Sequence, residues 1–311
     1  MRSVRNISLV CSHCEGEAGD VIIGGVLDKP ANTMHEKLVR YMSEQDDLRR
    51  LLLHEPRGRP EMSVVLVLPP CNPVLLETGS IPMKEPVTEV KLDTAAGLIT
   101  AKAECSKGRC KSVSFENVPA FVYGLDKTVN IPGVGTILVD IAYGGQGYVI
   151  AQAKDLDIEI HTSNRDRLVD VDLGNRLKTA VLAQDMPTHP ENPAIRGINN
   201  VIISEPLVDQ DGVKSVKHTV IVTPGRLDRS PCGTGSSSRL AVLYARGQIQ
   251  IGEKVIFRSV IETEFIGTVR GTEKVGHTDA VLPNIQGRAW ITGERKVLLD
   301  PDDPFQRGFL I

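Results

Sequence analysis

The chain has 311 residues, of which 41% are hydrophobic and 24% charged, and its formal net charge at pH 7 is −3. This composition is usual for a globular protein, and the length favours two domains over a single core. Basic residues form no long cluster and no apolar run reaches the roughly 18 residues of a membrane span, so we expect neither a nucleic-acid partner nor a membrane.

In chain order, the N-terminal stretch up to Glu17 lacks the long apolar region and cleavage site of a secretion signal, so we expect a cytoplasmic location. β-branched runs then dominate and predict strands at 21–26, 62–70, 88–105, 137–144, 217–224, 253–260 and 263–270. Helical patterns cover 33–50, which Thr33 and Glu36 open as a capping box, part of 168–184, and 236–246, which stops at Gly247. Because strands and helices do not alternate regularly, the predicted fold class is α+β.

An internal repeat is visible. Residues 74–83 resemble 241–250, and residues 16–25 correspond roughly to 143–153. Two similar halves predict two pseudo-symmetric lobes with a central cleft, although β-rich chains also look self-similar by chance. We expect one lobe to comprise residues 1–130 with 290–311, and the other to comprise 131–289.

The repeat is interrupted at Pro73 and Val74. In the second half, the strand at 217–224 is followed by a Gly- and Ser-rich stretch before the repeated segment, whereas in the first half the strand at 62–70 runs almost directly into it. The proline-rich residues before Val74 cannot form the first turns of a helix. A segment is therefore missing here. Either the chain truly lacks it, or residues were lost before the chain was numbered, and we favour the second explanation.

The stretch from Asp228 to Arg239, DRSPCGTGSSSR, follows a predicted strand and opens a helix. Gly233 lets the backbone fold tightly, and N–H groups at a helix N-terminus bind a carboxylate. We expect the same positive helix end to lower the pKa of Cys232, so that a thiolate can remove a proton beside a bound carboxylate. Asp228 would hold an ammonium group. The alternatives are a Gly-rich turn with an inert buried cysteine, or a phosphate loop that lacks its lysine.

The string DRSPCGTG resembles the second catalytic-cysteine motif of the proline racemase family, which includes hydroxyproline epimerases. Further similarity lies in HCEGEAGDVIIGG, in DIAYGGQGYVI and in LDPDDPF, so it spans nearly the whole chain. The resemblance implies a diaminopimelate-epimerase-like fold and chemistry without a cofactor. It also implies that Cys232 is one acid/base, that Asp228, Gly233 and Thr234 contact the substrate, and that the substrate is a small molecule, proline or a hydroxyproline.

Four functions remain open, of which a cysteine hydrolase ranks last because no histidine lies near Cys232 in the sequence. The first is a racemase or epimerase, in which two residues act on opposite faces of the α-carbon. The second is a trans-3-hydroxy-L-proline dehydratase, with or without 2-epimerase activity, which the unusual start HCEGEAGD favours. The third is an inactive amino-acid-binding homologue, if the junction of Pro73 and Val74 is a true deletion.

The resemblance also shows what is missing. The family's first motif, Met-Cys-Gly-His or a variant with Ser, should follow the strand at 62–70, and Cys71 lacks the Gly-rich helix start of such a motif. We expect no metal, because the spacing of Cys11 and Cys14 from Cys105 and Cys110 is too loose for a zinc site. A homodimer is compatible with the resemblance alone.

Overall fold

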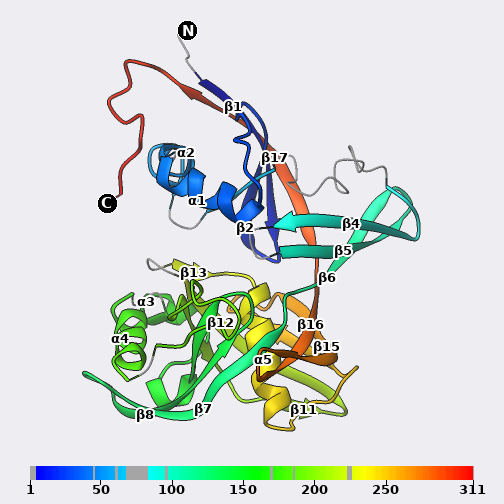
Figure 1. Cartoon of the computed structure of the whole chain (residues 1–311), viewed down its shortest axis with the longest axis vertical. Helices are drawn as coiled ribbons and strands as arrows, with labels where there is room; N and C mark the ends of the chain where they lie inside the picture. The colour runs from blue at the N-terminus through cyan, green and yellow to red at the C-terminus, as the bar shows by residue number, and fades with distance from the viewer. Residues whose placement is uncertain are drawn as a thin grey trace. The chain divides into compact units, whose positions relative to one another are not determined.

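The computed structural model describes residues 5–44, 46–59, 62–67, 83–94, 97–168, 171–184, 186–222 and 226–310. Contacts divide the chain into two compact units. Unit 1 comprises Met1–Val113 with Arg288–Ile311, and unit 2 comprises Ser114–Gly287 (Figure 1). No helix in the described ranges is long and apolar enough to cross a membrane.

Unit 1 is a small sheet covered by two helices. Its helices are α1 (Met34–Glu44) and α2 (Asp46–Leu53), and its strands are β1 (Arg5–Cys14), β2 (Glu17–Gly24), β3 (Ser63–Leu66), β4 (Val87–Thr94), β5 (Gly97–Ser106) and β17 (Ala289–Leu299). β6 (Arg109–Glu116) carries the chain into unit 2. One sheet has the order β17-β1-β2-β3, with β3 parallel to β2, while β4 and β5 pair as an antiparallel hairpin.

The core of unit 1 lies between that sheet and α2. Ile7 and Leu9 of β1 are at most 1% exposed, and they pack in one cluster with Leu48, Leu51 and Leu52. The predicted N-cap is confirmed, because Glu36 N donates to Thr33 Oγ1 at 3.1 Å. The helical pattern predicted over 33–50 corresponds to α1 and α2, which lie on either side of Gln45, a residue outside the described ranges, and α2 extends to Leu53.

Unit 2 contains a closed barrel of eight strands. These strands are β7 (Ala120–Ile131), β8 (Gly135–Tyr143), β9 (Gly147–Gln152), β10 (Asn200–Ser204), β12 (Val213–Val222), β14 (Lys254–Arg258), β15 (Glu264–Val275) and β16 (Thr278–Gly287). Each pairs with the next, and β16 pairs back to β7. The remaining elements are β11 (Val208–Gln210), β13 (Arg226–Asp228), α3 (Arg165–Leu168), α4 (Val171–Leu182), α5 (Gly233–Ala245) and two short 3-10 helices, Ala153–Leu156 and Thr162–Asn164.

Helix α5 lies inside this barrel (Figure 1, in yellow) and contacts β7, β8, β9, β15 and β16. Its residues Leu240, Val242 and Leu243 are completely buried. α4 packs on the outer side of the barrel wall. Successive side chains of a strand point to opposite faces, and on β9 Val149 packs in the same cluster as α4 while Ile150 packs in the same cluster as α5. A strand buried on both faces reads as a continuous apolar run, which is why these segments were easily predicted as strands.

The predicted α+β class is confirmed as a sheet-rich fold with few helices. The helix predicted over 236–246 begins earlier, at Gly233, and Gly247 follows it with a φ of +67°. The units divide after Val113 and Gly287, against the expected 130 and 289. The difference at the first boundary is mainly β7, which pairs with β8 in the barrel of unit 2.

The two units share one order of elements. In unit 1, β1 and β2 form an antiparallel hairpin, two helices follow, and β3 returns parallel to β2. In unit 2, β8 and β9 form a hairpin, α3 and α4 follow, and β10 returns parallel to β9. The same order then ends in antiparallel pairs, β4 with β5 and β14 with β15. This shared topology supports the repeat inferred from the sequence.

The units differ in the stretch before those last pairs. In unit 2, the stretch 205–253 between β10 and β14 includes β12 and α5, whereas in unit 1 only the stretch 67–86 separates β3 from β4. That stretch is shorter than the 10-residue β12 and the 13-residue α5 together. Unit 1 is thus shortened at the place where unit 2 carries its central helix.

We expect Leu240→Ala to destabilise unit 2 by about 2–5 kcal/mol, because it leaves a cavity around a helix that the barrel encloses. Urea unfolding followed by circular dichroism measures this loss. Leu138→Ala is the matched control, since Leu138 on β8 is 50% exposed and its truncation should change stability by less than about 0.5 kcal/mol. Equal losses in both variants would contradict the central position of α5.

Candidate active site

Cys232 lies at the point where the chain enters the barrel as α5. β13 pairs antiparallel with β12 and ends at Asp228, and Cys232 is the residue directly before the first turn of α5. Its φ of +60° is in the left-handed region, which a non-glycine residue adopts only where the surroundings hold it. The side chain is buried, with 8% of its surface exposed.

Asp228 braces the turn that leads to Cys232. Its Oδ1 accepts hydrogen bonds from the backbone N–H of Ser230 at 2.9 Å and from the Ser230 hydroxyl at 2.8 Å. The same hydroxyl oxygen accepts a hydrogen bond from Cys232 N at 3.1 Å. The carboxylate and the backbone of Cys232 are therefore joined through one serine, and the predicted residues Asp228 and Cys232 belong to one local structure.

Glycines let other chain segments approach the start of α5. A Cβ at Gly235 would lie 3.1 Å from Val220 and 3.2 Å from Cys232 Sγ, closer than side chains normally pack. A Cβ at Gly144 would collide with the backbone of Thr234 and Ser238. Gly233, predicted as a substrate contact, has only Phe115 near its Cβ position, at 3.2 Å.

His218 on β12 holds the carbonyl that precedes Cys232. Its Nε2 donates to Pro231 O at 2.6 Å, and Ser236 Oγ donates to the same oxygen at 2.9 Å. The ring is completely buried and stacks on Phe257 with 5.3 Å between centroids. Burial lowers the pKa of His218 to about 4, so the imidazole is neutral at physiological pH and acts here as a hydrogen-bond donor.

The expectation that the helix end lowers the pKa of Cys232 is wrong. Burial raises this pKa to about 12, and the nearby negative charge of Asp228 adds to the rise. Hydrogen bonds from Tyr148, Gly235 N and Thr234 act in the opposite direction but do not outweigh the loss of water. At neutral pH the thiol is therefore protonated.

Thr234 faces a group that sequence reasoning missed. Its Oγ1 lies 2.6 Å from the hydroxyl of Tyr148, a residue on β9 that is only 1% exposed. Tyr148 reads in the sequence as one more aromatic residue of a strand, and only the barrel brings it to Cys232, 84 residues further along the chain. A buried tyrosine hydroxyl needs a hydrogen-bond partner, and this requirement was the one available signal.

The site holds all four predicted residues, Asp228, Cys232, Gly233 and Thr234, within unit 2. The junction of Pro73 and Val74, and Cys71 beside it, lie outside the described residues. No group of three or more His, Cys, Asp or Glu side chains in the described ranges is placed to hold a metal ion.

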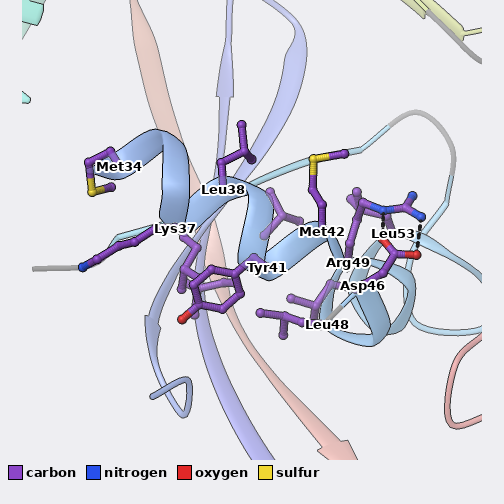
Figure 2. Close-up of a pocket in the computed structure, with 13 residues that line it drawn as sticks. Met34, Lys37, Leu38, Tyr41, Met42, Asp46, Leu48, Arg49 and Leu53 are labelled. Carbon is purple, nitrogen blue, oxygen red and sulfur yellow. Dashed lines mark hydrogen bonds and ion pairs between the residues drawn. The ribbon is translucent and has the colours of Figure 1, made fainter. Parts of the chain in front are cut away.

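A separate apolar pocket lies in unit 1, between α1, α2 and the sheet (Figure 2). The polar groups at its edge are already paired. Lys37 Nζ lies 2.8 Å from Asp28, Arg49 pairs with Asp46, and the Tyr41 hydroxyl donates to Leu27 O. The pocket is lined mainly by apolar side chains of α1, α2 and the sheet, and we assign no function to it.

The family model described as proline racemase matches residues 9–74 and 71–310, so the chain belongs to the proline racemase family. It is 37% identical to a 4-hydroxyproline 2-epimerase of Streptosporangium roseum over all of both chains. It is also 39% identical to a 4-hydroxyproline 2-epimerase of Agrobacterium fabrum, over 99% of this chain and 96% of that protein. A crystal structure of a hydroxyproline epimerase from Agrobacterium vitis with bound trans-4-hydroxy-L-proline superposes with a TM-score of 0.90 at 36% identity, covering 100% and 96% of the two chains.

These comparisons locate the interruption seen in the sequence. The two matched stretches of the family meet at residues 71–74. The alignment to the Streptosporangium roseum protein spans 338 residues, whereas this chain has 311, so the relative carries additional positions. The printed sequence runs through Pro73 and Val74 without these additional positions, and the junction lies outside the described residues. That residues were lost before the chain was numbered stays a prediction.

We expect stability to fall as the pH drops from about 6.5 to 4, in part because of His218. Its pKa is lowered in the folded protein, so below 6.5 the unfolded chain takes up a proton that the folded chain refuses. The contribution reaches about 3 kcal/mol near pH 4. Urea unfolding at pH 4, 5, 6 and 7 should show a weaker pH dependence in His218→Gln than in the parent. Identical slopes would show that His218 is not buried as a neutral ring.

Proposed function

We propose that the protein is a cofactor-independent epimerase that moves the α-proton of proline or a hydroxyproline, with 4-hydroxyproline as the first substrate to test. The observation that carries the proposal is the full-length identity of 37–39% to proteins named 4-hydroxyproline 2-epimerase. The arrangement around Cys232 supports it, because a reactive group, a carboxylate and a helix N-terminus meet at one turn.

The roles of the site residues follow from their chemistry. In the proposed reaction, the N–H groups at the start of α5, at Gly233 and Thr234, bind the substrate carboxylate and stabilise the negative charge that develops when the α-proton leaves. Asp228 is the carboxylate for the ammonium group. With both charged groups of the amino acid bound, the α-carbon is held beside the thiol of Cys232.

Because its pKa is raised, Cys232 is protonated at neutral pH, and in the two-base reaction it acts first as the acid. A protonated thiol donates its proton to one face of the α-carbon while a base removes the original proton from the other face. The resulting thiolate is then the base for the reverse reaction. One thiol therefore serves both directions, and inversion needs a second acid/base opposite to it.

That second group is the part of the machinery that this chain lacks. The first motif of the family should follow the strand that contains β3, close to where the two matched stretches of the family model meet. In the second half, Cys232 opens α5, and in the first half the corresponding stretch 67–86 is too short for such a strand and helix together. We infer that the opposing acid/base belongs to the absent segment. The minor thiolate form of Cys232 then removes the α-proton, the resulting thiol exchanges its proton with solvent and returns it to the same face, so we expect proton exchange at that face to outpace inversion.

Several finer expectations stay predictions. They are the diaminopimelate-epimerase-like fold with a central cleft, the lobes 1–130 with 290–311 and 131–289, a cytoplasmic location and a homodimer. The dehydratase also stays an alternative. It needs one base and loss of the ring hydroxyl, and its product is a cyclic imine instead of a 2-epimer. The product of the reaction decides between the two enzymes.

We expect the protein to incorporate deuterium at the α-carbon of trans-4-hydroxy-L-proline in D2O and to form cis-4-hydroxy-D-proline more slowly. Proton NMR follows the exchange, and chiral chromatography follows the epimer. Cys232→Ala should lower both rates by a factor of about 100 or more, because it removes the proton donor. Cys110→Ala is the control, since Cys110 is an exposed cysteine of unit 1.

Two outcomes would overturn this proposal. A cyclic imine from trans-3-hydroxy-L-proline, without any 2-epimer, would identify a dehydratase. Tight binding of pyrrole-2-carboxylate, which is planar at the reacting carbon, without exchange or inversion of any substrate would identify an inactive binding homologue.

We further expect that inserting the additional segment of the Streptosporangium roseum protein between Pro73 and Val74 will restore fast inversion. The insertion would supply unit 1 with the strand and helix that unit 2 has as β12 and α5. The ratio of inversion to exchange should rise about tenfold or more, as expected for a second positioned acid/base. An inserted segment of the same length and scrambled sequence is the control, and an unchanged ratio would mean that the opposing group lies elsewhere.

A further inference from the structure

The sulfur of Cys232 has two hydroxyl groups beside it, from the buried Tyr148 and the half-buried Thr234, and the buried Asn200 lies against the tyrosine hydroxyl. The Tyr148 hydroxyl oxygen lies 3.6 Å from Cys232 Sγ and 2.6 Å from Thr234 Oγ1. Thr234 Oγ1 is itself 3.8 Å from the sulfur. Asn200 Nδ2 donates to the Tyr148 oxygen at 3.4 Å, and both Tyr148 and Asn200 are at most 4% exposed. Two hydroxyl groups therefore stand beside one thiol, with little water near them.

The available hydrogens restrict what these groups can do. The amide nitrogen of Asn200 donates to Gln146 Oε1 at 2.5 Å and to the Tyr148 oxygen, and it accepts nothing. The tyrosine oxygen is thus an acceptor from Asn200, and its own hydrogen must point to Thr234 or to Cys232. The hydrogen of Thr234 has the same choice between Tyr148 and Cys232.

We propose that Tyr148 is a positioning residue for the acid/base chemistry, and that with Thr234 it forms a pair of rotating hydroxyls that hydrogen-bond both the thiol and the thiolate of Cys232. In the thiol state, the tyrosine hydrogen points to Thr234 and the thiol hydrogen has a hydroxyl oxygen to donate to. In the thiolate state, both hydroxyl hydrogens turn to the sulfur. The inference rests on the proposed function, because only an acid/base needs both states.

The proton balance of the step is simple. When Cys232 acts as an acid, its S–H bond breaks, the proton joins the α-carbon, and the electron pair stays on sulfur. When it acts as a base, the reverse occurs. Tyr148 and Thr234 keep their protons throughout and change only the direction of their O–H bonds. The raised pKa of Tyr148, which burial causes, is consistent with a hydroxyl that does not ionise.

The charges around the sulfur explain why such a pair is needed. From β13, the charge of Asp228 disfavours the thiolate, as burial does. From α5, the N–H of Gly235 and the hydroxyl of Thr234 favour it, and from β9 the hydroxyl of Tyr148 favours it. His218 on β12 is neutral and bonds to Pro231 O. Tyr148 is therefore one of the few groups that lower the energy of the thiolate in a site that otherwise opposes it.

The test removes one hydroxyl and reads the thiol directly. Tyr148→Phe keeps the buried ring, so the fold should survive. At a fixed pH between 8 and 9, we expect the rate of Cys232 alkylation by iodoacetamide, resolved by peptide mass spectrometry, to fall about tenfold, because one hydrogen bond to the charged form is lost. Alkylation of the exposed Cys14 is the internal reference. Tyr123→Phe is the matched control, as this half-buried tyrosine of β7 packs against Phe121.

A spectroscopic readout covers the case in which access limits alkylation. The infrared S–H stretching band of Cys232, taken as a difference spectrum against Cys232→Ala, should shift in Tyr148→Phe and stay in place in Tyr123→Phe. In turnover, we expect a lower kcat in both directions with KM changed less than about twofold. An unchanged alkylation rate with an unchanged S–H band would overturn the proposal.

The outcomes also separate this inference from the proposed function. If Tyr148→Phe alters the thiol but no substrate is epimerised by any variant, the hydroxyl pair stands and the proposed function fails. If epimerisation is observed and Tyr148→Phe leaves both the thiol and kcat unchanged, the function stands and the hydroxyl pair fails.

Discussion

The chemistry of this protein depends on where its central helix begins. α5 is enclosed by the barrel of unit 2, so the residue before it must lie where water is scarce. That position places Cys232 at the helix N-terminus and also buries its sulfur. The two effects act in opposite directions on the pKa of the thiol, and burial is the stronger. A helix end alone therefore does not produce a reactive thiolate, and the neighbouring side chains decide how the sulfur ionises.

The enclosure of α5 by the barrel also explains why the backbone around Cys232 is held in one conformation. The left-handed φ of Cys232 is held by contacts on both sides of the residue. Before it, Ser230 connects the backbone N–H of Cys232 to Asp228, while His218 and Ser236 hold the carbonyl of Pro231. After it, Gly235 leaves room for the sulfur. Strain at one residue is thus balanced by several hydrogen bonds, which keep the thiol of Cys232 at a fixed place.

Much of the fold could be predicted from the sequence, because continuous apolar runs such as 217–224 are typical of strands buried on both faces. The four candidate site residues could be proposed for a different reason: they lie close together in the chain, in one short glycine-rich motif whose local structure depends little on the rest of the fold. Tyr148 and His218 were not found, since each reaches Cys232 only through the closure of the barrel. The predicted pKa of Cys232 was wrong because a sequence shows the helix end but not how much water is excluded from it.

The interruption at Pro73 and Val74 was visible in the sequence because the chain contains an internal repeat, so that each half can be compared with the other. Each half predicts what the other should hold, and the shared order of hairpin, helices and parallel strand aligns the two halves element by element. The short stretch 67–86 in the first half and the additional positions of a relative are independent signs of one absent segment. Under the proposed function, inversion needs an acid/base from each half, and a chain with one complete half keeps an acid/base at one face. We therefore expect proton exchange and inversion, which a complete enzyme couples, to be separable in this protein.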